Sequence, residues 1–342
     1  MSTFKQRHRR ARRGAVLALL AAGVLAVAAC GDTGGDSSGG GGGGGDQASF
    51  KRPVNLIVPF SPGSGSDRAA RLVSPVLEDA LSVQFPVINV PGATGNTGMT
   101  KLLQSRPSEN IAVTAADTLA TVAAGSSSFK LDEVKPVCRL SLAPSLLWVN
   151  SKGKYKSWED LSRAAKANPG KITVATVGQG GIDDIMLGAL AQKGIKFRAV
   201  PFAENAERRG ALLSNDVDAL YEQAGDVQEN LAAKQFTPVL MFGEKRSGLK
   251  GDYKMSSELG VTDVIDQWRA VFAHADMPDG QVQALSDACR NAEKDKAFTD
   301  FQAKAFERPH PFMAQSQFEP FVQKELQRMQ TLGKQYGVYK GS

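Results

Sequence analysis

The chain has 342 residues and a formal net charge of +6 at pH 7. The excess lies in residues 1–29, which hold six lysines and arginines and no acid. From Cys30 onward the chain has 35 basic and 35 acidic residues. Composition therefore gives no support for a nucleic-acid partner, and we expect none.

Residues 1–29 have the pattern of a secretory signal peptide. A basic start is followed by an apolar run from Ala15 to Ala29, which is short for a membrane-spanning helix. Val27-Ala28-Ala29-Cys30 resembles a bacterial lipobox, which predicts a lipoprotein signal peptide over 1–29 and a lipidated Cys30. The alternative is an ordinary signal peptide with an incidental cysteine.

A flexible tether is predicted over residues 30–50, because seven consecutive glycines occupy 39–45. A lipidated cysteine before a tether predicts an extracytoplasmic protein anchored to the cell membrane. Two further cysteines, Cys138 and Cys289, predict either a disulfide or two buried thiols, and the sequence leaves both open.

After Pro53 strand-like and helix-like segments alternate, which predicts an α/β fold with mostly parallel sheets. Strands are expected at 54–60, 85–90, 111–115, 145–150, 172–177, 196–201, 217–221, 237–242 and 268–274. Helices are expected at 67–81, 95–104, 158–167, 183–193, 204–214 and 226–233, and throughout 279–336.

Two lobes are expected, since the globular part is longer than most single cores. Ser145–Asn150 and Gln267–His274 are apolar strands that each carry a tryptophan and each follow a completed series of strands and helices. If both cross between lobes, lobe 1 comprises 52–147 plus 268–342 and lobe 2 comprises 152–265. Such a pair of hinge strands lets a cleft close on a ligand.

The loop Ser61–Ser66 is the strongest site signal. It follows the apolar strand Leu56–Phe60 and precedes a helix for which Asp67 is the expected N-cap. Free N–H groups at a helix N-terminus bind anions. Similar turns recur at Pro91–Gly98, after Ala115 and at Gly178–Gly181.

Known enzyme patterns fail on this chain. Neither the G-x-x-x-x-G-K-[ST] phosphate loop nor the G-x-G-x-x-G pattern is present, and the one G-x-S-x-G match falls in the glycine-rich tether. His274 and His310 have no neighbouring nucleophile pattern, and we find no metal-ligand cluster. We expect a binding protein with no cofactor and no metal; a secreted hydrolase or transferase is disfavoured.

Several phrases are similar to the solute-binding proteins of tripartite tricarboxylate transporters, also called the Bug family. They are Pro53–Asp67, Asn89–Gly98, Lys166–Ile172 and Val200–Phe202, in that family's order and spacing. The resemblance implies a two-lobed fold of periplasmic-binding-protein type II-like architecture and no enzymatic activity. It also implies a small organic carboxylate, tricarboxylate- or dicarboxylate-like, delivered to the permease subunits in the membrane. We expect a monomer.

The resemblance also implies the site residues. In lobe 1 they are Ser61, Gly63, Ser64, Gly65, Ser66, Asp67, Thr94, Gly95, Asn96, Thr114, Asp117 and Thr118. In lobe 2 they are Gly178, Gln179, Gly180, Gly181, Asp183, Asp184, Phe202, Glu222 and Gln223.

This chain departs from the family on the lobe 2 side. Asp183 and Asp184 replace the family's Ser-His and would repel an anion, unless they cap their helix or bind a hydroxyl, an amine or a cation. The family's Val-Pro-Tyr/Phe-Lys-Gly has become Val200-Pro-Phe-Ala-Glu204, which removes a lysine and adds an acid, and Glu222 adds another. Asp67 is expected to shape its loop rather than to contact ligand. The solute stays open, as does the alternative that the receptor presents it to a sensor kinase.

Overall fold

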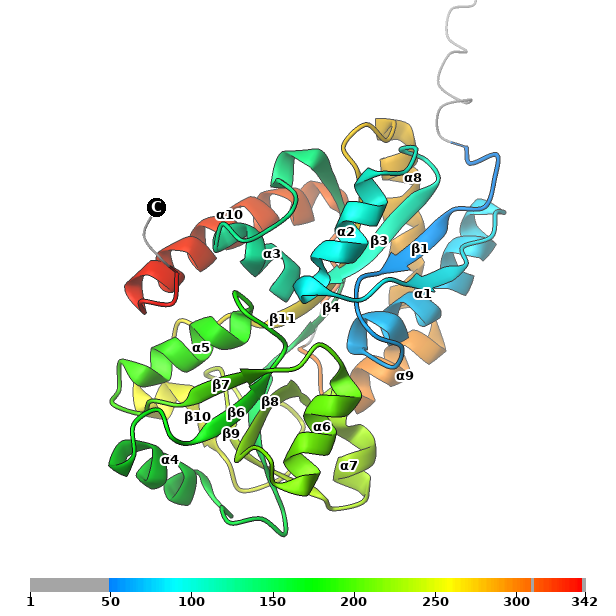
Figure 1. Cartoon of the computed structure of the whole chain (residues 1–342). Coiled ribbons are helices and arrows are strands. Elements are labelled where there is room, and N and C mark those ends of the chain that lie inside the picture. Colours follow the sequence, from blue (N-terminus) through cyan, green and yellow to red (C-terminus); the bar gives the residue numbers. More distant parts are fainter. Residues whose placement is uncertain (1–48, 309–310, 340–342) are drawn as a thin grey trace, which may run out of the picture. The chain divides into compact units, whose positions relative to one another are not determined.

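The computed structural model describes residues 49–308 and 311–339 (Figure 1). The predicted signal peptide, Cys30 and nearly all of the predicted tether lie outside these residues. Within them, no helix is long and apolar enough to cross a membrane.

The first sheet has the strand order β2-β1-β3-β11-β4. Its strands are β1 (Asn55–Val58), β2 (Val87–Asn89), β3 (Asn110–Ala115), β4 (Val134–Ala143) and β11 (Gln267–His274). Its helices are α1 (Gly65–Leu81), α2 (Asn96–Leu103), α3 (Ala116–Ala123), α8 (Asp279–Arg290), α9 (Lys296–Lys304) and α10 (Gln315–Gln335).

The second sheet has the order β10-β9-β5-β8-β6-β7. Its strands are β5 (Ser145–Asn150), β6 (Thr173–Thr176), β7 (Arg198–Pro201), β8 (Ala219–Gln223), β9 (Phe236–Met241) and β10 (Lys254–Met255). Its helices are α4 (Trp158–Ala167), α5 (Ile182–Ala191), α6 (Asn205–Ser214) and α7 (Gln228–Ala232).

The predicted α/β fold with two lobes is confirmed, with both sheets mixed rather than purely parallel. Strands β2, β1 and β3 are parallel, as are β7, β6 and β8. The expected hinge strands are the antiparallel ones: β11 pairs with β3 and β4, and β5 pairs with β8 and β9. This direction follows from each strand entering its sheet from the other lobe.

We propose lobe 1 (52–147 plus 268–342) and lobe 2 (152–265) as the units that move. The first sheet draws its strands from 55–143 and 267–274, and the second from 145–255. The limit at residue 147 falls inside β5, so the passage between lobes occurs at residue 144.

Several sequence predictions of local structure were wrong. Residues 279–336 are not helical throughout, since Phe306 has a φ of 56° and 305–308 and 311–314 separate α9 from α10. The short strand β10 was also not expected. Strand β4 was missed because Lys135, Pro136 and Arg139 interrupt its apolar residues. Arg139 is nevertheless buried: its Nε donates to the Pro311 carbonyl at 2.7 Å, and its guanidinium lies over the Phe321 ring. Helix α1 begins two residues early, because Ser64 rather than Asp67 is its N-cap.

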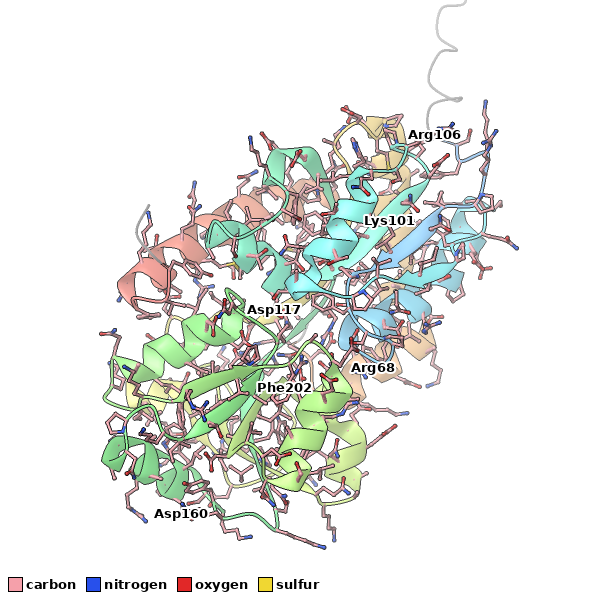
Figure 2. The ribbon with its side chains drawn as sticks, in the orientation of Figure 1. Arg68, Lys101, Arg106, Asp117, Asp160 and Phe202 are labelled. Carbon is pink, nitrogen blue, oxygen red and sulfur yellow. A yellow bond between two sulfur atoms is a disulfide. The ribbon has the colours of Figure 1, made fainter. Side chains whose placement is uncertain are left out.

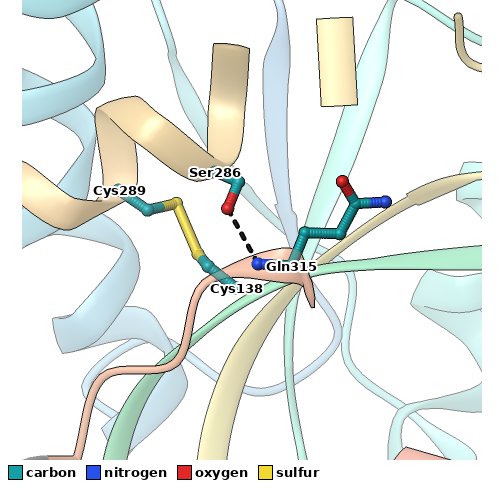
Figure 3. The surroundings of a disulfide bond; sticks show 4 residues. All are labelled: Cys138, Ser286, Cys289 and Gln315. Carbon is teal, nitrogen blue, oxygen red and sulfur yellow. Dashed lines mark hydrogen bonds between the residues drawn. A yellow bond between two sulfur atoms is a disulfide. The ribbon is translucent and has the colours of Figure 1, made fainter. Parts of the chain in front are cut away.

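Cys138 and Cys289 form a disulfide, which answers the question left open by the sequence (Figure 3). The bond joins β4 to α8 with a Cα–Cα distance of 6.7 Å. Beside it the Ser286 hydroxyl of α8 accepts from the Gln315 N–H at the start of α10, at 2.9 Å. The outer face of the first sheet is thus cross-linked to two of its helices.

Candidate functional site

The predicted loops converge where the carboxyl ends of the parallel strands of one sheet face those of the other (Figure 1). Two cavities lie there. We call the larger one, of about 800 Å³, the outer cavity. The smaller one, of about 30 Å³, is the inner cavity, and it has room for about two water molecules. Phe60 and Val177 line both.

The structure divides the predicted site residues between these cavities. The outer cavity is lined by Thr94, Gly95, Asn96, Gly178, Gln179 and Gly180 among others. The inner cavity is lined by Ser64, Gly65, Ser66, Asp117, Glu222 and Gln223 among others. Asp184 lines a neighbouring hollow. Neither the outer nor the inner cavity is lined by Ser61, Gly63, Asp67, Thr114, Thr118, Gly181, Asp183 or Phe202.

Asp67 holds the first loop in shape. Its carboxylate accepts from the Gly63 N–H at 2.9 Å, from Asn89 Nδ2 at 2.9 Å and from Arg71 Nε at 3.0 Å. Burial alone would raise the pKa of Asp67, but these hydrogen bonds and the Arg71 charge outweigh it and lower that pKa. Asp67 is therefore an ionised supporting residue inside the first turn of α1.

The N-terminus of α1 keeps two donors free. Ser64 Oγ accepts from the Asp67 N–H at 3.2 Å, and the Ser64 carbonyl accepts from Arg68 N. The N–H groups of Gly65 and Ser66 have no acceptor within the described residues. Arg269 of β11 packs directly on Gly65, in space that any side chain at that position would fill. Two free donors and a guanidinium thus meet at one point of the inner cavity.

The second loop is held by its own hydroxyl and amide groups. Thr114 Oγ1 donates to Thr118 Oγ1 at 2.8 Å, and Thr118 Oγ1 donates to the Thr94 carbonyl at 3.2 Å. Asn96 Oδ1 accepts from the Ser128 N–H at 2.9 Å. All four residues from Gly92 to Gly95 have a positive φ, including Ala93 and Thr94. These non-glycine residues are strained there, which suits a loop shaped for binding.

On the second lobe, three aspartates occupy the N–H groups of the loop before α5. Asp183 accepts from Val177 N at 2.7 Å, and Asp184 accepts from Gly180 N at 2.8 Å. Asp117 reaches across from α3 and accepts from Ile182 N at 3.0 Å. Asp183 and Asp184 therefore both make capping contacts, which was one of the alternatives that the sequence left open.

All three aspartates have a raised pKa. Burial, with Asp184 and Asp117 close by, raises the pKa of Asp183 well above its usual value. Burial also raises the pKa of Asp117 and of Asp184, against the hydrogen bonds that each accepts. The wall on this side is consequently acidic, and its Val177, Gly180 and Ile182 N–H groups are in use.

Charged pairs surround the inner cavity. Arg208 Nη2 donates to Glu222 Oε2 at 2.7 Å, and both side chains are only 3% exposed. Asp226 accepts from Arg269 Nη2 at 2.7 Å and from Arg68. Arg68 and Arg269 belong to the first lobe and Asp226 to the second, so this carboxylate joins the lobes (Figure 2 labels Arg68 and Asp117 at this junction).

Sequence reasoning missed the arginines and Asp226. A signal for Arg208 existed: it precedes Ala211 and Leu212 by three and four residues, which places it on the apolar face of α6. A cation on an apolar face needs a buried partner, and Glu222 was already suspected near the cleft. Arg269 offered no such signal, because every second residue of a strand faces the same side and β11 is buried on both.

The geometry defines a class of protein: a two-lobed α/β binding protein with its site between the lobes. A family model described as "Tripartite tricarboxylate transporter family receptor" matches residues 69–338. The chain belongs to that family of periplasmic solute receptors, which bind solutes and are not enzymes, and its place is extracytoplasmic.

Among curated proteins the chain is similar to a UPF0065 protein of Bordetella pertussis, with 26% identity over 257 residues, covering 73% of this chain and 79% of the relative. It is similar to protein BugT of the same organism, with 26% identity over 286 residues, covering 81% and 87%.

Among solved structures it resembles the periplasmic binding protein BugD, with TM-score 0.76 and 20% identity, covering 85% of this chain and 100% of that one. It also resembles MatC from Rhodopseudomonas palustris with bound malate, with TM-score 0.75 and 22% identity, covering 82% and 99%. A further R. palustris protein, solved with adipate, has TM-score 0.76 and 19% identity, covering 84% and 98%. At these identities the likeness shows a shared fold.

Proposed function

We propose that this receptor binds a small organic carboxylate between its lobes and delivers it to the permease subunits of a tripartite transporter. The observation that carries the proposal is the inner cavity, where the free N–H groups of Gly65 and Ser66 meet the Arg269 guanidinium. Backbone donors at a helix N-terminus together with a guanidinium match a carboxylate in charge and hydrogen bonding. The relatives solved with malate and adipate support this ligand class.

The binding cycle begins on the first lobe. A carboxylate that reaches the α1 N-terminus accepts from Gly65 and Ser66 and lies against Arg269. Closure of the second lobe then brings Arg208, Glu222 and the 177–182 loop over the ligand, which excludes water and strengthens the contacts with charged groups. The closed form is the one that the permease would recognise.

Calorimetry on the purified mature chain tests ligand capture. Malate, adipate and a wider carboxylate panel are titrated into the wild-type protein and into Arg269→Gln. At least one carboxylate should bind at micromolar affinity or better. Arg269→Gln should weaken it by about ten- to one-hundredfold, the usual worth of a charge-assisted hydrogen bond.

The matched control is Arg106→Gln, which removes an exposed arginine that pairs with Glu109 away from both cavities. It should leave affinity unchanged. If no carboxylate binds, the proposal is wrong. If both variants lose the same affinity, Arg269 does not contact the ligand.

We also propose that lipidated Cys30 anchors the receptor to the membrane. The Cys138–Cys289 disulfide supports an oxidising, extracytoplasmic location for the folded part. In cells, Cys30→Ser should move the protein from the membrane fraction to the soluble fraction. A wild-type protein that fractionates as soluble would contradict the anchor while leaving ligand capture untouched.

A further inference from the structure

The two cavities differ sharply in charge. The inner cavity is lined by Arg208, Arg269, Asp117, Glu222 and Asp226. None of the twenty residues that line the outer cavity is Asp, Glu, Lys, Arg or His. The cavities meet at Phe60 and Val177, so a ligand with its carboxylate in the inner one extends its remaining atoms into an uncharged space.

Several backbone donors beside the outer cavity are already in use. On the first-lobe side, Gly95 N and Thr97 N donate to the Gly92 carbonyl at 3.0 and 3.4 Å, and Asn96 N donates to Ala93. On the second-lobe side, Val177 N and Gly180 N donate to Asp183 and Asp184. These five N–H groups are therefore not available to a second carboxylate.

The acceptors themselves add to this effect. Asp183 and Asp184 follow the 178–180 segment of the outer cavity wall after only two residues, and Asp184 is half-buried beside it. A second carboxylate there would lose its hydration, gain no cation and lie near fixed acidic groups. Each of these effects disfavours a ligand whose end in the outer cavity is charged.

An uncharged tail finds suitable walls. Pro59, Phe60, Ala93, Pro201, Val338 and the Tyr339 ring provide apolar surface, with hydroxyl and amide groups between them. A volume of about 800 Å³ is in the range of pockets that enclose drug-sized ligands, larger than a four-carbon diacid needs.

We infer that the solute is a monocarboxylate with an uncharged, largely apolar tail, and that the receptor selects it over dicarboxylates. This inference rests on the proposed function, because it assumes that one carboxylate occupies the inner cavity. It separates this chain from the relatives solved with malate and adipate, which are dicarboxylates.

Calorimetry with hexanoate, adipate and adipate monomethyl ester tests the selection. Hexanoate and adipate share a six-carbon chain and differ only in the second carboxylate, and the ester restores the length without the charge. Hexanoate and the ester should bind at least tenfold more tightly than adipate. Equal or tighter binding of adipate would overturn the inference.

A variant locates the source of the selection. Asp184→Ala removes one acidic group and frees the Gly180 N–H. It should therefore reduce the difference in affinity between hexanoate and adipate. Asp160→Ala, at a partly exposed site on α4 far from the cavities, is the control and should keep the wild-type ratio of the two affinities. An unchanged ratio in Asp184→Ala would also count against the inference.

The outcomes separate this inference from the proposed function. If no carboxylate of any kind binds, the proposed function fails, and the inference falls with it. If adipate binds as tightly as hexanoate or more tightly, and Arg269→Gln weakens that binding, the proposed function stands and the monocarboxylate inference alone is wrong. Thermal unfolding of each variant confirms that the titrated protein is folded.

Discussion

Asp226 is a buried carboxylate of the second lobe that pairs with arginines of the first. Its carboxylate contacts Arg68 and Arg269 on the first lobe, and its carbonyl accepts from Arg209 Nη1 at 3.1 Å. Burial alone would raise the pKa of Asp226, but the charges of Arg269 and Arg68 outweigh it and lower that pKa. Asp226 thus stays ionised and acts as the counter-ion of Arg269.

A ligand carboxylate at Arg269 would compete with this internal carboxylate. We expect Asp226→Asn to bind the best carboxylate about tenfold more tightly, because the ligand becomes the counter-ion that Arg269 lacks. The variant should also unfold at a lower temperature, since two arginines lose their partner. Calorimetry and thermal unfolding measure the two effects.

Asp279→Asn is the control for net charge, because Asp279 is 91% exposed and pairs with Lys135 at the start of α8. It should change neither affinity nor unfolding temperature by much. Weaker binding in Asp226→Asn would mean that Asp226 holds Arg269 in its binding position rather than competing for it.

At the residue scale the sequence predicted the loop donors but not the charges. Ser64, Gly65 and Ser66 follow an apolar strand directly, so their place at a helix start could be inferred from neighbours in the chain. The pairing of Asp226 with Arg269 joins residues 43 positions apart, and Arg68 is 158 positions away. No local sequence pattern shows which buried charged residues will form ion pairs.

Gln223 illustrates the same limit. With its amide oxygen accepting from Ser145 Oγ at 3.0 Å, its nitrogen donates to Glu222 Oε1 at 3.2 Å and to Asp226 Oδ2 at 3.1 Å. The family resemblance implied it as a ligand contact, in the segment after Tyr221. In this amide orientation it also connects the two buried carboxylates.

At the scale of single elements, the disulfide supports β4, the strand that the sequence did not reveal. Cys138 and Cys289 are both fully buried, and their bond closes a loop with a sequence separation of 151. The bond lies in the first lobe, away from both cavities. It therefore stabilises the first sheet, from which binding loops extend, without contacting ligand.

We expect the Cys138→Ser, Cys289→Ser double variant to lose up to about 5 kcal/mol of stability, the entropy that a loop of this length removes from the unfolded chain. Chemical unfolding measures the loss. Carboxylate affinity at low temperature should stay unchanged, because no site residue moves. Unaltered unfolding would show that the bond adds nothing to stability, and lost affinity in the folded variant would tie β4 to the site.

Element boundaries show what periodicity can and cannot predict. Helix α5 was expected at 183–193 and spans Ile182–Ala191, because its apolar residues recur clearly. Strand β4 carries two basic residues and a proline, and its burial depends on α8, α9 and the 311–314 segment packing over it. That cover comes from a part of the chain some 150 residues later, which no local window contains.

At the scale of the whole described chain, the two lobes are in contact on several sides of the site. These contacts include Asp226 with Arg68 and Arg269, Asp117 with the α5 N-terminus, Arg328 with Asp263, and α10 packed on both α3 and α5. The two-lobe architecture was predictable from the two tryptophan-bearing crossing strands. The contacts between the lobes were not, because they join segments that are distant in the sequence.

The last described residues have a practical consequence for anyone who labels this protein. Val338 and Tyr339 line the outer cavity, and the Tyr339 hydroxyl lies 3.2 Å from the Ala120 carbonyl oxygen on one lobe and 3.5 Å from the Gly180 carbonyl oxygen on the other. This position is where an environment-sensitive dye would report solute capture, which makes the receptor a candidate biosensor.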